Sequence, residues 1–147
     1  MTYQEAKYAT SLTTTALTAV VYAMRVQPLY ASGYFDGPDG MALTGRAILI
    51  LIGGIVVAGI IGQILLAIGT SIAGAELEMN EDERDKLIEL KAMNLGFSIF
   101  GAGFLASFIA LALGWPPFEV FHFIIYAMVI CGLMADIIRI WLHRRGF

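Results

Sequence analysis

Two long stretches without a charged residue constrain this chain more than any other feature. Residues 47–75 and residues 92–118 contain no Asp, Glu, Lys or Arg. A helix that crosses the hydrocarbon core of a bilayer needs about 20 apolar residues, because it covers about 30 Å at about 1.5 Å per residue. Each stretch is therefore long enough to form one membrane-spanning helix.

The composition of the whole chain agrees with a membrane location. Hydrophobic residues make up 59% of the 147 residues, charged residues make up 14%, and the mean hydropathy is +0.77. Soluble domains contain roughly 25% charged residues. The net charge of −3 excludes a strongly basic nucleic-acid binder, and no nucleic-acid partner is expected. A single cysteine, Cys131, excludes an internal disulfide framework, CxxC chemistry and a cysteine-rich zinc site.

The sequence predicts an all-α membrane protein with four transmembrane helices in two hairpins, a single four-helix domain over residues 1–147. Residues 31–43 are rich in Gly, Pro, Asp and Ser, which end a helix, and a Gly-Trp-Pro-Pro turn covers residues 114–117. The predicted spans are residues 8–30, 47–72, 92–114 and 118–142.

The positions of Lys and Arg predict that both termini are cytoplasmic. This topology places most basic residues on the inner side and leaves only Arg25 and Arg46 on the outer side. Lys and Arg are enriched in cytoplasmic segments of membrane proteins. The inner set is Lys7, Arg84, Lys86, Lys91, Arg139, Arg144 and Arg145.

Small residues recur every four positions in the second and third spans. Gly54, Ala58 and Gly62 form one row, and Ala102 and Ala106 belong to another. Such rows let helix backbones approach closely in lipid. We favour packing of the second and third spans within the molecule; the alternative is that one row faces another protomer or a different subunit.

The first span is rich in hydroxyl groups. These side chains either hydrogen-bond to carbonyls of their own helix and to a neighbouring helix, or they line a path for water. The residues are Thr10, Ser11, Thr13, Thr14, Thr15 and Thr18.

Ionisable residues within membrane helices are candidates for function, because an unpaired charge is costly there. Arg25, Arg46, Glu119 and His122 all fall near the outer interface. We expect a structural ion pair between Glu119 and one of the two arginines; a proton-handling pair of Glu119 and His122 is the alternative. At the inner end, Asp136 and Arg139 are three residues apart, which predicts an ion pair within one helix.

An acidic connector, residues 76–91, joins the two hairpins and is predicted to be helical. Three interpretations stay open: a solvated connector, a docking face for a partner, or a divalent-metal site. The candidate docking residues are Glu81, Asp82, Asp85 and Glu89. The acidic residues lack the ligand spacing of a calcium-binding loop, so no metal ligand is assigned.

The run DERDKLIE over residues 82–89, followed directly by a span, resembles a motif of small, uncharacterised bacterial multi-spanning membrane proteins. In those proteins the run lies on the cytoplasmic side between hydrophobic hairpins. The resemblance covers residues 81–145. It implies a bacterial inner membrane and transfers no catalytic residue.

No motif in the chain supplies a reactive constellation, so no catalytic residue and no cofactor are predicted. The leading hypothesis is a non-enzymatic accessory, scaffolding or regulatory subunit that contacts membrane lipid and associates with other proteins or with itself. A small oligomeric transporter or channel is the alternative, and a pigment- or cofactor-binding subunit is third.

Overall fold

The computed structural model describes residues 3–72 and 83–145, which form four helices. They are α1 (Tyr3–Ala31), α2 (Gly40–Ile72), α3 (Glu83–Ala112) and α4 (Pro117–Arg144). The prediction of an all-helical chain is confirmed. Each helix includes its predicted span almost completely, and α2 and α3 begin several residues earlier than expected. Residues 83–91 of the acidic connector are helical and run directly into the apolar part of α3.

Glycine and proline set the helix ends at the two short loops. Gly114 has φ of +79°, and the backbone N–H of Trp115 donates to the carbonyl of Ala110, which closes the last turn of α3. Pro117 then occupies the first turn of α4, where its missing N–H costs nothing. At the other loop, Gly33 has φ of +74°. The two predicted loops are confirmed at residues 32–39 and 113–116, but residues 40–43, which the sequence placed in the first loop, belong to α2.

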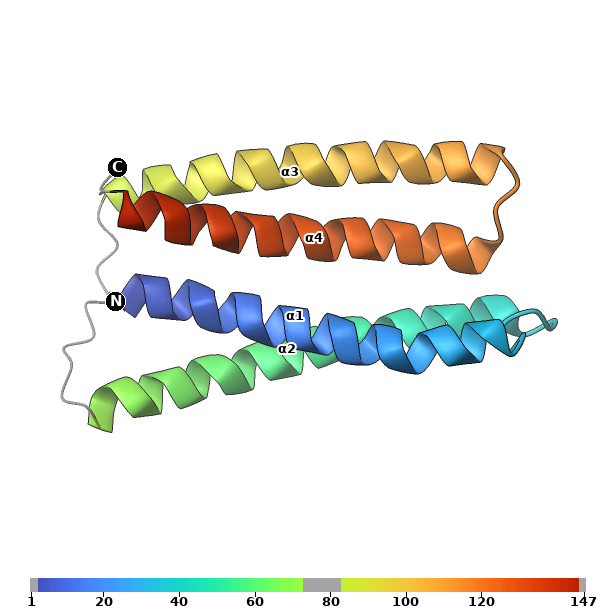
Figure 1. Cartoon of the computed structure of the whole chain (residues 1–147), viewed down its shortest axis with the longest axis horizontal. Helices are drawn as coiled ribbons and strands as arrows, with labels where there is room; N and C mark the ends of the chain where they lie inside the picture. Colours follow the sequence, from blue (N-terminus) through green and yellow to red (C-terminus); the bar gives the residue numbers. More distant parts are fainter. Residues whose placement is uncertain (1–2, 73–82, 146–147) are drawn as a thin grey trace.

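The helices form a row of two hairpins rather than a closed ring of contacts (Figure 1). α1 packs against α2, α3 packs against α4, and the two hairpins meet mainly through α1 and α4, with a smaller contact between α2 and α4. Within the described residues, α3 contacts neither α1 nor α2. The prediction that the second and third spans pack against each other is therefore wrong.

The glycines of the α2 row do pack within the molecule, but they face α1, the hairpin partner of α2. A Cβ added to Gly62 would lie 2.8 Å from Cγ2 of Thr14, and one added to Gly54 would lie 3.2 Å from Cγ2 of Thr18. On α3, a Cβ added to Gly103 would collide with Cβ of Ala127. Small residues permit close approach to any neighbour, so the rows alone do not specify which helix they face.

The residues predicted for packing differ in their burial. Gly54, Ala58 and Gly62 are half-buried in α2. On α3, Ala106 is half-buried but Ala102 is exposed. The close contact with α4 is made at Gly103, and the neighbouring Ser107 is buried. Ala102 is therefore not part of the observed helix contact.

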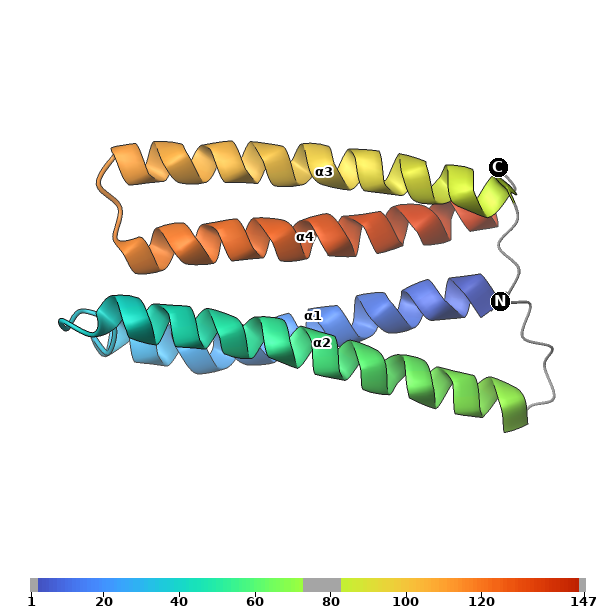
Figure 2. The ribbon, with the colours of Figure 1, turned by 180° about the vertical axis from the view of Figure 1, so that it is seen from behind.

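Both views of the ribbon show two distinct ends of the molecule (Figures 1 and 2). The loop end carries the short connections at residues 32–39 and 113–116, and the termini end carries the start of α1 and the end of α4. Toward the termini end α2 diverges from the other helices (Figure 2). One cluster of buried apolar side chains lies nearer the loop end and consists of Tyr22, Val26, Phe35 and Leu51. Buried Ile88, Ala92, Ala135 and Leu142 lie nearer the termini end.

Three helices, α2, α3 and α4, are long and apolar enough to cross a membrane. Their outward faces carry many exposed Leu, Ile, Val and Phe side chains, which suits contact with lipid. α1 is less apolar because of its hydroxyl groups. Three of these, on Thr13, Thr14 and Thr18, donate to the carbonyl oxygen four residues earlier at 2.7–2.9 Å. For these three the structural interpretation of the hydroxyl row is confirmed.

Candidate functional site

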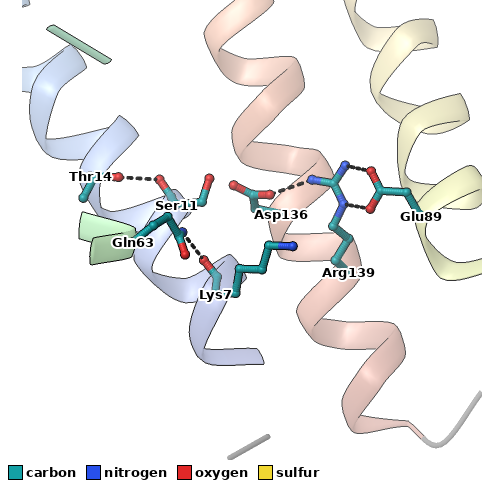
Figure 3. Close-up of polar contacts among 7 residues, drawn as sticks. All are labelled: Lys7, Ser11, Thr14, Gln63, Glu89, Asp136 and Arg139. Atoms are coloured by element: carbon teal, nitrogen blue, oxygen red, sulfur yellow. Dashed lines mark hydrogen bonds and ion pairs between the residues drawn. The ribbon is translucent and has the colours of Figure 1, made fainter. Parts of the chain in front are cut away.

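An ion cluster of Glu89, Asp136 and Arg139 lies toward the termini end (Figure 3). Arg139 donates to both carboxylate oxygens of Glu89, at 2.8 Å from Nε and 2.7 Å from Nη2. Its Nη1 also lies 2.7 Å from Oδ1 of Asp136. The predicted pair of Asp136 and Arg139 is confirmed. The two-point contact with Glu89 additionally ties α3 to α4, because the planar guanidinium matches a carboxylate at two atoms.

The ion cluster borders a polar cavity of about 310 Å³ that α1 and α2 also line. Lys7 and Ser11 line it from α1 and Gln63 lines it from α2. Figure 3 shows the Lys7 side chain extending from α1 toward α4, and Nε2 of Gln63 donating to the Lys7 carbonyl at 3.0 Å. Arg139 and Lys7 carry two positive charges against two carboxylates, so the cavity is balanced in charge.

This balance suits a structural role. Asp136 is 6% exposed, and a buried carboxylate is costly unless it is paired and hydrogen-bonded. Arg139 supplies both requirements and also lies over the Tyr8 ring, with Cζ 5.3 Å from the ring centroid. The cluster therefore fixes α1, α3 and α4 to one another at this end.

The candidate docking residues are placed differently from the prediction. Glu89 points to Arg139 of α4 rather than to a free face, and Oδ1 of Asp85 lies 3.7 Å from Nδ1 of His143. Glu81 and Asp82 lie outside the described residues. The part of the acidic docking face that the structure describes is thus engaged within the molecule.

A second polar site lies toward the loop end, where α1 meets α4. His122 is 4% exposed, and both of its ring nitrogens have partners. Nδ1 lies 2.8 Å from the Phe118 carbonyl, so it carries the proton, and Nε2 accepts from the Tyr22 hydroxyl at 2.7 Å. A metal or pigment at Nε2 would have to displace Tyr22. Among the described residues no group of three metal-ligating side chains occurs.

Glu119 has a different partner from the one predicted. Its carboxylate accepts a hydrogen bond from the Tyr30 hydroxyl, and in the described part of the chain neither Arg25 nor Arg46 forms an ion pair with it. Both arginines are exposed. Arg25 lies five residues before Tyr30, which turns its side chain away from the α1 face that meets α4. The four predicted polar residues therefore do not form one site.

A pocket of about 270 Å³ opens beside Glu119, and we call it the loop-end pocket. Five aromatic side chains line it together with the carboxylate: Tyr30, Trp115, Phe118, Phe123 and Tyr126. Val26, Gln27 and His122 complete the lining. The pocket is slightly smaller than the roughly 300–1,000 Å³ typical of drug-sized ligand sites, so it suits a small ligand.

The sequence analysis did not identify Tyr22 and Tyr30, the hydrogen-bond partners of His122 and Glu119. Their spacing could have revealed them, because Tyr22, Val26 and Tyr30 are four residues apart and share one face of a helix. That face is the one that packs against Glu119 and His122.

No protein-family model, curated protein or solved structure matches this chain.

Proposed function

We propose that the protein is a non-enzymatic integral membrane subunit that associates with other membrane polypeptides through the outward face of α2. In this proposal α1 is a fourth span, both termini and the acidic connector are cytoplasmic, and the membrane is the bacterial inner membrane. The loop end then lies on the outer side. The positions of Lys and Arg and the resemblance of the DERDKLIE run support this placement.

One observation carries the proposal: α2 has glycines on the face that no described helix covers. A Cβ added to Gly45, Gly53 or Gly59 would meet no atom within 4 Å. At about 100° per residue these three glycines fall within an arc of about 120°. Gly54, Ala58 and Gly62, which face α1, lie on the opposite side of the helix.

Open glycines on a lipid-facing helix call for an explanation. Glycine costs about 1 kcal/mol relative to alanine within a helix, and lipid does not repay this cost, because acyl chains pack equally well against methyl groups. A neighbouring helix does repay it, because small residues let the two backbones approach closely. We therefore assign the open face of α2 to a helix of another polypeptide or of a second copy.

The native mass of the protein, extracted into lipid nanodiscs from its own membrane, tests this assignment. We expect a discrete assembly for the natural chain and a loss of that assembly in Gly53→Leu. Gly69→Leu is the matched control, because Gly69 is an equally open glycine of α2 outside this arc. A monomeric natural chain, or an assembly that survives Gly53→Leu, would overturn the proposal.

A small oligomeric transporter is the second candidate, and the loop-end pocket favours it. The pocket combines aromatic side chains, an acidic group and enough volume for a small molecule at the proposed outer surface. Uptake of a bound compound into proteoliposomes, compared with Glu119→Gln, separates transport from a purely structural subunit.

A further inference from the structure

The loop-end pocket contains one carboxylate whose charge is not balanced by a cation. Glu119 accepts from the Tyr30 hydroxyl, and no Lys, Arg or His in the described residues lies within ion-pair distance of it. His122, three residues on, uses both ring nitrogens elsewhere. A carboxylate offers about four lone-pair directions, and Tyr30 fills one of them. The remainder of the carboxylate is available to a ligand.

An acidic side chain is favourable at the position that Glu119 occupies in its helix. Glu119 lies in the first turn of α4, where the partial positive charge of the helix N-terminus stabilises an anion. This contrasts with the ion cluster, where Arg139 neutralises the acidic side chains directly. The pocket thus presents an acidic side chain and disfavours anionic ligands.

The aromatic lining supplies the second element of recognition. Tyr30 and Phe118 stack on each other with centroids 4.4 Å apart and form one wall. Trp115 and Phe123 are 46% and 41% exposed, and neither has a ring partner among the described residues. Part of each side chain is therefore accessible to a ligand. The negative face of an aromatic ring attracts a cation, and tryptophan does so most strongly.

A carboxylate among aromatic rings suits an organic cation better than a metal ion. Dedicated Ca²⁺ sites gather several carboxylate and carbonyl oxygens around the ion, whereas this pocket offers a single carboxylate surrounded mainly by aromatic side chains. In a substituted ammonium ion, alkyl groups surround the charged nitrogen and water binds it only weakly. Aromatic ring faces can therefore take the place of this water. We propose that the loop-end pocket binds a small substituted ammonium ion, with Glu119 as counter-ion and Trp115 and Phe123 as cation–π partners.

Two sources share this chemistry: a free quaternary ammonium compound and the choline headgroup of a phospholipid. Both would place the charged nitrogen beside Glu119. They differ in that a headgroup arrives through the bilayer and competes with a free ligand only when the membrane contains it. The inference does not depend on the subunit role proposed above, because the pocket is lined by α1, α4 and the loop before α4, and no residue of α2 lines it.

Tryptophan fluorescence gives a direct test, since the chain has only Trp115 and Trp141. In Trp141→Phe, Trp115 is the sole reporter and lies in the pocket. The protein is placed in phosphatidylglycerol nanodiscs and titrated with choline and with its uncharged isostere 3,3-dimethylbutan-1-ol. We expect a saturable change with choline and none with the isostere. The same titration in phosphatidylcholine nanodiscs shows weaker apparent binding if headgroups occupy the pocket, and unchanged binding if only free ligand does.

Two charge-matched variants decide the role of Glu119. In the Trp141→Phe background, Glu119→Gln should raise the Kd for choline at least tenfold. Asp39→Asn removes the same charge from the exposed loop at this end of the molecule and should leave the Kd within twofold. Equal binding by these variants, or equal binding of the isostere, would overturn the proposal.

A third variant covers the case in which Glu119→Gln does not fold. Phe123→Leu removes an exposed ring and keeps an apolar side chain, so the fold should survive, as circular dichroism would show. We expect the Kd for choline to rise several-fold. An unchanged Kd in a folded Phe123→Leu protein would contradict the assigned aromatic contact.

Discussion

The two polar sites of this molecule differ in how their charges are balanced. At the termini end, Arg139 joins Glu89 and Asp136, and Lys7 lines the same cavity. At the loop end, Glu119 has a tyrosine hydroxyl as partner, and no cation of the described residues pairs with it. The first site satisfies its charges within the molecule and therefore holds helices together. The second leaves one charge for a ligand. A polar residue in a membrane helix therefore indicates a function only once its partners within the molecule are known.

The largest loss of stability is expected when Arg139 is removed. Arg139→Met keeps much of the side-chain volume but leaves Asp136 buried without a partner, which costs about 3–5 kcal/mol. We expect the free energy of unfolding, measured by denaturant titration in micelles, to fall by that amount. Arg139→Met combined with Asp136→Asn should recover part of the loss, because the unpaired charge is gone. A single variant as stable as the natural chain would show that the ion cluster is not structural.

At the loop end, the largest structural effect should come from Tyr22. Tyr22→Phe leaves Nε2 of buried His122 without its hydrogen-bond donor, and an unsatisfied buried polar atom costs about 1–3 kcal/mol. Thermal unfolding followed by circular dichroism measures this loss. Tyr34→Phe is the matched control, because the Tyr34 side chain is exposed and should tolerate the change. Equal melting temperatures for the two variants would contradict the assigned role of Tyr22.

The smallest changes in stability are expected when one carboxylate is neutralised at each site. Glu89→Gln weakens a two-point ion pair whose carboxylate side chain is 41% exposed, so solvent screening limits the loss to about 1 kcal/mol. Glu119→Gln retains an acceptor for Tyr30 and should change stability by less than about 0.5 kcal/mol. Unfolding free energies of the two variants test the difference. The reverse order would mean that Glu119 is the structural carboxylate and Glu89 the spare one.

The sequence predicted the helices well because their signals are local. Uncharged length located the helices. Glycine and proline located the two loops, predicted at residues 31–43 and 114–117 and observed at residues 32–39 and 113–116. The pair of Asp136 and Arg139 was also local, since the two residues are three apart on one helix. The structure confirms that α2, α3 and α4 are long and apolar enough to span a membrane; the crossing of α1 and the orientation of the termini stay predictions.

The pairing of helices was predicted incorrectly because small residues do not specify a partner. Gly62 meets methyl groups of Thr10 and Thr14, and nothing in the glycine row distinguishes α1 from α3 as its neighbour. The predicted partner of Glu119 was wrong for a related reason. The rotation of α1 about its axis decides whether Arg25 or Tyr30 faces α4, and charge alone favoured the arginine.

The threonine hydrogen bonds of α1 have a consequence for the insertion of the protein into a bilayer. The hydroxyls of Thr13, Thr14 and Thr18 donate to carbonyl oxygens of their own helix. Fewer hydroxyl donors of α1 are therefore left without a partner in lipid than its composition implies. It is still the least apolar of the four helices, and it leaves the ribosome before α2. The methyl groups of Thr10, Thr14 and Thr18 lie against the glycines of α2. Under the proposed topology, α1 therefore enters the bilayer most readily together with α2, as one helical hairpin.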